Sequence, residues 1–458
     1  MIKYLSRPPG FYRRLFHLAL PIILQNLITT SLGFVDTFMV GLLGQEELSA
    51  VTAANSPIFL VQVIVFGLIS GLTILVSQYW GKGDIDAVNR AMGVALYSGV
   101  TIAGLVALTL LFFPRGVMAL VTNNPVLIDL GAPYVRIVGV SYVFNAASSV
   151  YVGMQRSTEN PVMGLSVFTV SMLLNTCLNY ILIFGKFGAP ALGVTGAAIA
   201  TLTSRVVEFL ITAVYALRCR RVPLRPKELL RPGRLMLRSF VTYSAPVLLN
   251  ESLWGLGTAV ITAIMGHMAI STDILAAHAI MGNIDKFATV ACFGIAGATA
   301  VIVGKRIGEG GSREEVYSLS WCLLLVSLII GGVVAVCLAL LLPTFFIPYL
   351  YPLFHLKDQA LRIAVMMCAI NAVMVPMRAF DITNITGVLR AGGDSRMASV
   401  IDLAPLWLTA VPLTALTGLV LDAPVFWVCL SVQAESFTKM PLGILRMRSK
   451  KWINNITQ

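Results

Sequence analysis

Residues 20–41 have the sequence LPIILQNLITTSLGFVDTFMVG, and residues 245–266, APVLLNESLWGLGTAVITAIMG, repeat its pattern 225 positions later. Pro21 of the first stretch aligns with Pro246 of the second. Each stretch is apolar for long enough to cross a bilayer as a helix, which takes about 20 residues. The pair therefore indicates membrane-spanning helices in a chain made of two similar halves.

The repeat continues along the chain. Residues 66–84, FGLISGLTILVSQYWGKGD, align with 293–311, FGIAGATAVIVGKRIGEGG, and Gly67 falls opposite Gly294. Each half has room for six spans, so the two repeats run parallel rather than inverted. Two helical bundles with a midline cleft between them are a plan that transporters use.

Composition supports the same fold class. Of the 458 residues, 57% are hydrophobic and 12% are charged, whereas a soluble domain carries about 25% charged residues. The long apolar blocks argue against a β-barrel, which would show short segments of alternating polarity. We expect an all-α integral membrane protein with twelve transmembrane helices in two six-helix bundles, at 14–41, 50–80, 88–113, 126–153, 161–184, 191–218, 238–266, 274–307, 314–342, 357–389, 397–420 and 424–447.

Charge predicts the domain organisation and the orientation. We expect an amino-terminal bundle at 1–217, a basic linker at 218–238 that is dispensable for transport, and a carboxy-terminal bundle at 239–458. Of the 33 Lys and Arg residues, 24 fall in one set of loops and the termini and three in the opposite loops. The positive-inside rule places both termini and the linker in the cytoplasm, with the chain in the cytoplasmic (inner) membrane. The net charge of +12 then reflects topology and contact with anionic lipids rather than a nucleic-acid partner.

No motif for catalysis is found. The sequence has no GxxxxGK[ST] loop, so ATP is not the direct source of energy. It has no HExxH or GxSxG motif, and its seven cysteines include no CxxC pair. We expect neither an enzyme nor a cofactor.

Asp36 is the strongest candidate for a functional residue. It follows Pro21 by 15 residues inside an apolar helix, where a charge costs about 2.5–3.5 kcal/mol and must be neutralised or paired. Such a carboxylate can exchange a proton or a sodium ion. Asn175 and Asn179, four residues apart, face one way on their helix, and Thr201 follows on the next. The alternative is a set of structural hydrogen bonds between helices.

The second half has its own intramembrane charges. Glu251 is a candidate for contact with a cation or substrate, or for a polar contact between bundles. Asp381 is a second candidate, although Arg378, three residues before it, can form a local ion pair with it. Asp285 and Lys286 are adjacent and could balance each other. Further intramembrane carboxylates are Asp402 and Glu435.

Four segments of the chain resemble the multidrug and toxic compound extrusion (MATE) family of transporters. They are LALPIILQNLITTSLGFVDTFMVGLLGQEELSAV at 18–51, LNYILIFGKFGAPALGVTGAAIATLTSRVVE at 178–208, APVLLNESLWGLG at 245–257 and GVLRAGGDSR at 387–396. The resemblance covers almost the whole chain in order. It implies twelve helices in two V-shaped bundles and antiport of cationic or amphipathic drugs, driven by protons, sodium ions or both.

The resemblance also implies a cation-coupling site in the first half. Similar transporters build it from an Asp on the first helix, two polar residues on the fifth and a Thr on the sixth, which match Asp36, Asn175, Asn179 and Thr201. Pro21 matches a proline at which the first helix bends. Some relatives carry a second Asp where Asn179 stands, so a tightly bound sodium ion is less favoured here.

In the second half, the resemblance implies a Glu on the seventh helix and an Asp on the tenth. Glu251 and Asp381 correspond to them. Glu251 lies about one turn nearer its proline than in some relatives, and Asp381 lies nearer the following Leu389-Arg390 pair. Their partners are therefore open.

The resulting hypothesis is a monomeric secondary antiporter that exports cationic or amphipathic small molecules in exchange for protons and/or sodium ions. Besides these substrates, membrane lipids are the expected partners. One alternative is a flippase for a lipid-linked precursor, which would need several Arg and Lys residues in a central cavity. Another is an intramembrane enzyme, for which the four His residues are too dispersed.

Overall fold

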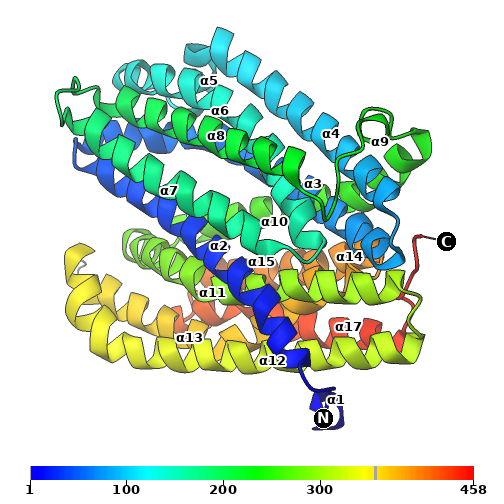
Figure 1. Ribbon diagram of the computed structural model, residues 1–458. Coiled ribbons are helices and arrows are strands. Elements are labelled where there is room, and N and C mark those ends of the chain that lie inside the picture. Colours follow the sequence, from blue (N-terminus) through cyan, green and yellow to red (C-terminus); the bar gives the residue numbers. More distant parts are fainter. Residues whose placement is uncertain (1, 355–357, 458) are drawn as a thin grey trace. The chain divides into compact units, whose positions relative to one another are not determined.

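The chain is helical along almost its whole length, and the computed structural model describes residues 2–354 and 358–457 (Figure 1). The α-helices are α1 (Ile2–Leu5), α2 (Phe11–Gly41), α3 (Gln45–Lys82), α4 (Ile85–Phe112), α5 (Pro114–Val121), α6 (Pro125–Ser157), α7 (Pro161–Phe184), α8 (Gly193–Arg218), α9 (Pro226–Leu230), α10 (Arg234–Gly266), α11 (Ser271–Gly308), α12 (Arg313–Leu341), α13 (Asp358–Ile382), α14 (Ser395–Pro405), α15 (Val411–Ala415), α16 (Val425–Val432) and α17 (Ala434–Ser449). Between them lie π-helical segments η1 (Leu342–Leu350), η3 (Thr383–Leu389), η4 (Leu406–Ala410) and η5 (Leu416–Val420), and the 3-10 turn η2 (Tyr351–Phe354). The described part of the chain contains no strand, so the all-α prediction is confirmed.

Eleven helices in the described ranges are long and apolar enough to cross a membrane. They correspond to the first eleven predicted spans. The twelfth, predicted at 424–447, is divided at Gln433 into α16 and α17, and each piece alone is shorter than the thickness of a bilayer. Two short helices, α5 and α9, were not expected, and each begins with a proline, which favours the first position of a helix.

The helices form two compact units. The amino-terminal unit is Leu24–Leu248, and the carboxy-terminal unit is Met1–Ile23 together with Leu249–Gln458. Their boundaries fall inside α2 and α10, two residues after Pro21 and Pro246. The division expected from the repeat, with bundles at 1–217 and 239–458 and a linker at 218–238, stays a prediction.

The repeated glycines have equivalent contacts in the two units. In the amino-terminal unit, a Cβ on Gly67 of α3 would lie 2.5 Å from a side-chain carbon of Leu248. In the carboxy-terminal unit, a Cβ on Gly294 of α11 would lie 2.2 Å from a side-chain carbon of Ile23. Both are shorter than any ordinary carbon contact. Each unit therefore seats one turn of a proline-containing helix against a glycine, which explains why the repeat retains both residue types.

Apolar side chains fill the interior of each unit and also cover much of its outer surface. Ile58 and Val135 are buried in the amino-terminal unit, and Leu323 is buried in the carboxy-terminal unit. By contrast, Leu105 is 60% exposed and Leu340 is 63% exposed. Large exposed apolar surfaces are rare on soluble monomers, so these helix faces fit contact with lipid.

The segment 218–238 is held against the amino-terminal unit. Val222 is fully buried, and the buried Asn89 of α4 donates from Nδ2 to the backbone oxygen of Pro223 at 3.2 Å. The Asn89 Oδ1 accepts from the backbone nitrogen of Arg225 at 3.1 Å. Arg90 pairs with Glu228 at 3.0 Å, so that α9 lies beside the start of α4 (Figure 1). The linker is thus a docked strap as well as a connection.

The residues after α17 are held in a similar way in the carboxy-terminal unit. Trp452 is fully buried, and its backbone oxygen lies against Gly392, where a Cβ would come within 2.4 Å of it. The backbone nitrogen of Asn454 donates to the Gly392 oxygen at 2.9 Å. Arg446 pairs with Asp394 at 2.7 Å. The chain leaving the last helix of each half therefore folds back on its own unit.

Candidate functional site

The four residues predicted to form the amino-terminal site come together in a chain of hydrogen bonds. Asn179 of α7 donates from Nδ2 to Asp36 Oδ1 of α2 at 2.6 Å and to Asn175 Oδ1 at 3.0 Å. Asn175 in turn donates to Thr201 of α8 at 3.5 Å. Both asparagines are buried and Asp36 is half-buried. Three helices thus place amide and hydroxyl groups around a single carboxylate.

This polar seam extends one turn further between α7 and α8. Ser171 donates to Glu208 Oε2 at 2.9 Å, and Arg205 pairs with the same oxygen at 2.7 Å. Glu208 is fully buried, and its Oε1 has no hydrogen-bond partner. Arg205 also interacts electrostatically with Asp36. In the sequence, Glu208 and Arg205 are charges inside an apolar span, and Ser171 continues the four-residue spacing of Asn175 and Asn179.

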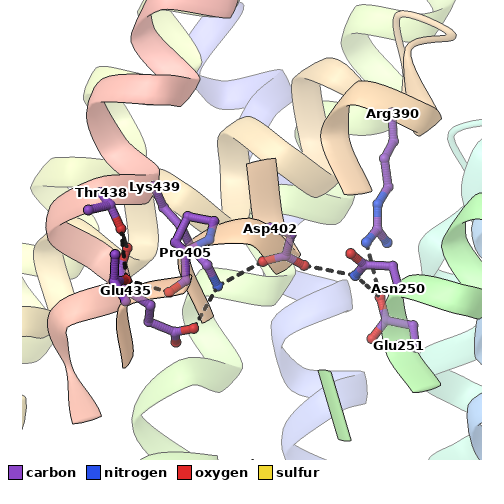
Figure 2. Close-up of polar contacts among 9 residues, drawn as sticks. Asn250, Glu251, Arg390, Asp402, Pro405, Glu435, Thr438 and Lys439 are labelled. Atoms are coloured by element: carbon purple, nitrogen blue, oxygen red, sulfur yellow. Dashed lines mark hydrogen bonds and ion pairs between the residues drawn. The ribbon is translucent and has the colours of Figure 1, made fainter. Parts of the chain in front are cut away.

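The carboxy-terminal unit contains a longer series of polar contacts, shown in Figure 2. Glu251 of α10 pairs with Arg390, which is only 2% exposed, at 3.0 Å. Next to it, Asn250 donates to Glu251 Oε1 at 3.4 Å and to Asp402 of α14 at 2.8 Å. Glu251 thus has an arginine partner within its own unit. Its predicted contact with a cation or substrate, or with the other bundle, stays a prediction.

The same series continues into α17. Lys439 Nζ lies 2.8 Å from Asp402 Oδ1 and 3.0 Å from Glu435 Oε2 (Figure 2). The Lys439 side chain is 7% exposed. Lys439 lies well inside the predicted span 424–447, where a charge is costly, so the sequence carried a signal for it that the site prediction does not include.

The predicted local ion pair between Arg378 and Asp381 is wrong. Arg378 of α13 instead forms a two-pronged pair with Asp285 of α11, at 2.5 Å and 2.8 Å. Asn371 contacts both partners, at 2.9 Å from Arg378 and 3.1 Å from Asp285. The expectation that Asp285 is balanced by Lys286 is wrong for the same reason. Two neighbours on one helix can pair, but the planar guanidinium binds a carboxylate best in this two-pronged geometry.

Asp381 remains buried without such a partner. It is 5% exposed, and its Oδ2 makes no hydrogen bond. It interacts electrostatically with Lys439, Glu435, Asp402 and Arg378, although neither of the two cations forms an ion pair with it in the described residues. The groups of charges that contain Glu251, Asp285 and Lys439 comprise five carboxylates and three cations, namely Glu251, Asp285, Asp381, Asp402, Glu435, Arg378, Arg390 and Lys439. This interior therefore has more acidic than basic groups.

A cavity of about 190 Å³ lies in the carboxy-terminal unit, among α10, α11, α13, α16 and α17. Its wall is largely apolar and includes Trp254, Met265, Met281 and Met367. The Asp285–Arg378 pair and Glu435 supply its charged groups. Glu251 and Asp381 are absent from the described lining, so the two residues predicted from the sequence do not lie on the wall of this cavity. In the residues described, no group of three or more His, Cys, Asp and Glu side chains is placed to hold a metal ion.

Helices long enough to span a membrane, buried charges between them and a cavity inside one unit are features of a membrane transporter. Comparison with known proteins identifies the family of transporters. The MatE family model matches residues 21–181 and 246–416, which covers both halves. The chain therefore belongs to the MATE family of multidrug-type transporters, and members of this family are transporters rather than enzymes.

The similarity to known proteins covers almost the whole chain. An uncharacterized transporter of Bacillus subtilis, YisQ, is 25% identical over 464 residues, covering 98% of this chain and 97% of that protein. The multidrug resistance protein MdtK of Edwardsiella ictaluri is 25% identical over 466 residues, covering 96% and 97%. A solved multidrug resistance MATE transporter in an outward-facing conformation has a TM-score of 0.86 at 17% identity, with 98% of both chains covered. The predicted fold of twelve membrane helices in two six-helix bundles is thereby confirmed.

Proposed function

We propose that this transporter is a secondary active antiporter that exports cationic or amphipathic small molecules in exchange for protons or sodium ions. The observation that carries the proposal is the hydrogen-bond chain from Thr201 through Asn175 and Asn179 to Asp36. A half-buried carboxylate held by neutral donors has two states, one charged and one neutralised by a bound ion. Antiport requires such a two-state group.

The chemistry of this cluster favours a proton over a sodium ion. Asp36 is the one carboxylate in the hydrogen-bond chain, and the position of Asn179 offers an amide in place of a second acid. A hard cation prefers several oxygen ligands, with carboxylates among them. The Asn179 Nδ2 group donates to Asp36 Oδ1, so Asn179 presents a donor to the carboxylate where a second acid would present an oxygen ligand.

The cavity of the carboxy-terminal unit supports the choice of substrate class. Methionine side chains are flexible and polarisable, and they suit surfaces that bind varied ligands. Trp254 can stack on a cation or an aromatic ring. Asp285, Glu435 and Arg378 are the charged residues of the described wall, so acidic groups outnumber basic ones there. These features fit an amphipathic cation.

The flippase alternative is less well supported. A pyrophosphate group would call for several free basic residues. In the described lining of the cavity, Arg378 is the one Lys or Arg residue, and Asp285 already binds it through two contacts.

Two further parts of the proposal concern movement and location. Pro21 lacks the backbone N–H of an ordinary helical residue and precedes the unit boundary by two residues, which supports a hinge at that point of α2. We also propose a cytoplasmic-membrane location with both termini in the cytoplasm, on the basic-residue bias. A reporter fused after residue 230 should be active inside the cell, and one fused after residue 188 should be active outside.

The test is drug efflux from proteoliposomes on which proton and sodium gradients are imposed separately. In the wild type, a proton gradient should drive efflux, and drug affinity should change with pH by a factor in the range of about 5 to 150. Asp36→Asn should abolish both effects while the protein still inserts. Asp129→Asn, which removes a carboxylate from the exposed pair with Arg115, should leave both effects unchanged. Drug affinity that is flat with pH in the wild type, or unchanged pH dependence in Asp36→Asn, would refute the coupling role.

A further inference from the structure

A lysine ammonium lies between two carboxylates in the interior of the carboxy-terminal unit. Lys439 of α17 contacts Asp402 of α14 at 2.8 Å and Glu435, one turn earlier on its own helix, at 3.0 Å (Figure 2). The side chains of Asp402 and Glu435 are 17% and 19% exposed. A buried ammonium is stable only where acceptors compensate for its lost hydration, and here two acids do so.

The surroundings hold the acceptors in place. Asn250 donates to the second oxygen of Asp402 at 2.8 Å, so both oxygens of this carboxylate are engaged. Asp381 interacts electrostatically with all three charged groups and with Arg378, and its Oδ2 is buried without a hydrogen-bond partner. Asp402 and Glu435 therefore contact the ammonium directly, while Arg390 acts on Asp402 and Arg378 acts on Glu435 without a direct ion pair among the described residues. Carboxylate oxygens from several helices are also what a hard metal cation would bind.

We propose that Lys439 is a built-in cation that occupies the space between Asp402 and Glu435 and excludes sodium ions from the carboxy-terminal unit. Its ammonium is tethered by its side chain, so it neutralises the two acids without being exchanged with the solution. Lys439 is then a residue that determines ion specificity, and this unit takes no part in sodium binding. This inference rests on the proposed antiport, because a coupling ion matters only in an antiporter. Sodium binding itself can be measured without transport.

The experiment measures binding of radioactive sodium to the purified full-length chain in detergent, in sodium chloride or choline chloride at equal ionic strength. Asp36→Asn serves as the background, so that the amino-terminal cluster adds no signal. In this background, the unchanged Lys439 and its Lys439→Arg variant should bind no sodium above the choline control. Lys439→Met should bind sodium above the choline control, at least about tenfold more tightly than the upper limit set for the unchanged Lys439 protein, and adding Asp402→Asn should remove that binding.

Folding is followed in the same samples by the unfolding temperature. Lys439→Met removes the cation that contacts Asp402 and Glu435, so sodium but not choline should raise its unfolding temperature. If it fails to fold in both salts, Lys439→Gln, which keeps a hydrogen-bond donor, takes its place. A folded Lys439→Met or Lys439→Gln protein without sodium binding would overturn the proposal. The proposal would also be overturned if the protein with Lys439 unchanged bound sodium and Asp402→Asn abolished that binding.

These outcomes are independent of the proposed function. Even if the protein fails to export drugs, sodium binding by Lys439→Met can be measured, and the result supports or overturns this inference. Conversely, a proton-driven exporter in which Lys439→Met gains no sodium site would keep the proposed function and lose this inference.

Discussion

Asn89→Ala is expected to release the strap formed by residues 218–238 from the amino-terminal unit. The Asn89 side chain is fully buried and joins α4 to the strap twice, through the oxygen of Pro223 and the nitrogen of Arg225. A third bond, to Ile85 of its own helix at 2.9 Å, fixes its orientation. Alanine can replace none of these contacts.

The magnitude follows from the two bonds to the strap. Each is worth about 0.5–1.5 kcal/mol net, so their loss weakens docking by about 1–3 kcal/mol. A change of about 1–3 kcal/mol shifts an equilibrium by a factor of about 5–150. Trypsin cuts a transiently open segment in proportion to its open population when opening and closing are fast. Cleavage within the strap, which contains eight Lys and Arg residues, should therefore accelerate by about 5–150-fold.

The assay is limited trypsin digestion of the purified protein, followed by the loss of the intact chain and the rise of two large fragments. Glu228→Gln is the matched control, because it removes the partly exposed pair with Arg90 and leaves the number of tryptic sites unchanged. Such pairs are worth about 0–1 kcal/mol, so its cleavage should accelerate less than that of Asn89→Ala. Equal cleavage rates in the wild type and Asn89→Ala would refute the docked strap.

Two further predictions concern single side chains. Glu251→Gln should lower the free energy of unfolding by about 3 kcal/mol, because Arg390 is left buried without a carboxylate. Adding Arg390→Met should recover most of the lost free energy of unfolding, as measured by thermal unfolding. If the double variant recovers none of it, the unpaired Arg390 is not the cause of the loss. Burial opposes ionisation of Cys219, but the backbone N–H groups of Val222 and Arg221 and the Gln155 amide favour the thiolate and hold its pKa below the usual value. Its alkylation, followed by mass spectrometry, should therefore reach half-maximal rate at a lower pH than a cysteine in an unstructured peptide, and an identical profile would contradict this account.

The amino-terminal cluster could be predicted because its geometry is largely local. Asn175 and Asn179 are one turn apart, so any helix places them on one face. Asp36 is conspicuous because charges are costly inside an apolar helix. Only the contacts from these residues to one another across three helices needed the structure.

The ion pairs of the carboxy-terminal unit could not be predicted in the same way. Asp285 and Arg378 are 93 positions apart, and their pairing depends on how α11 and α13 are rotated about their axes. Arg378 has a possible partner three residues along its own helix, Asp381, and spacing alone cannot choose between the two. The choice depends on two-pronged geometry and on burial, which arise only when the helices pack.

The repeat is stronger evidence for two units with the same packing than the apolar blocks alone. Gly67 and Gly294 occupy matching positions in the sequence, and in separate units each lies against a matching residue, Leu248 or Ile23. Each of those residues follows its proline by two positions. A glycine opposite the turn that follows a proline permits a close approach of two helices where the helix itself has lost a backbone hydrogen bond. The sequence retains the pair in both halves because the same packing problem arises twice. It follows that Pro21 and Pro246 are best understood together with the glycines that receive their helices, and not as isolated kinks.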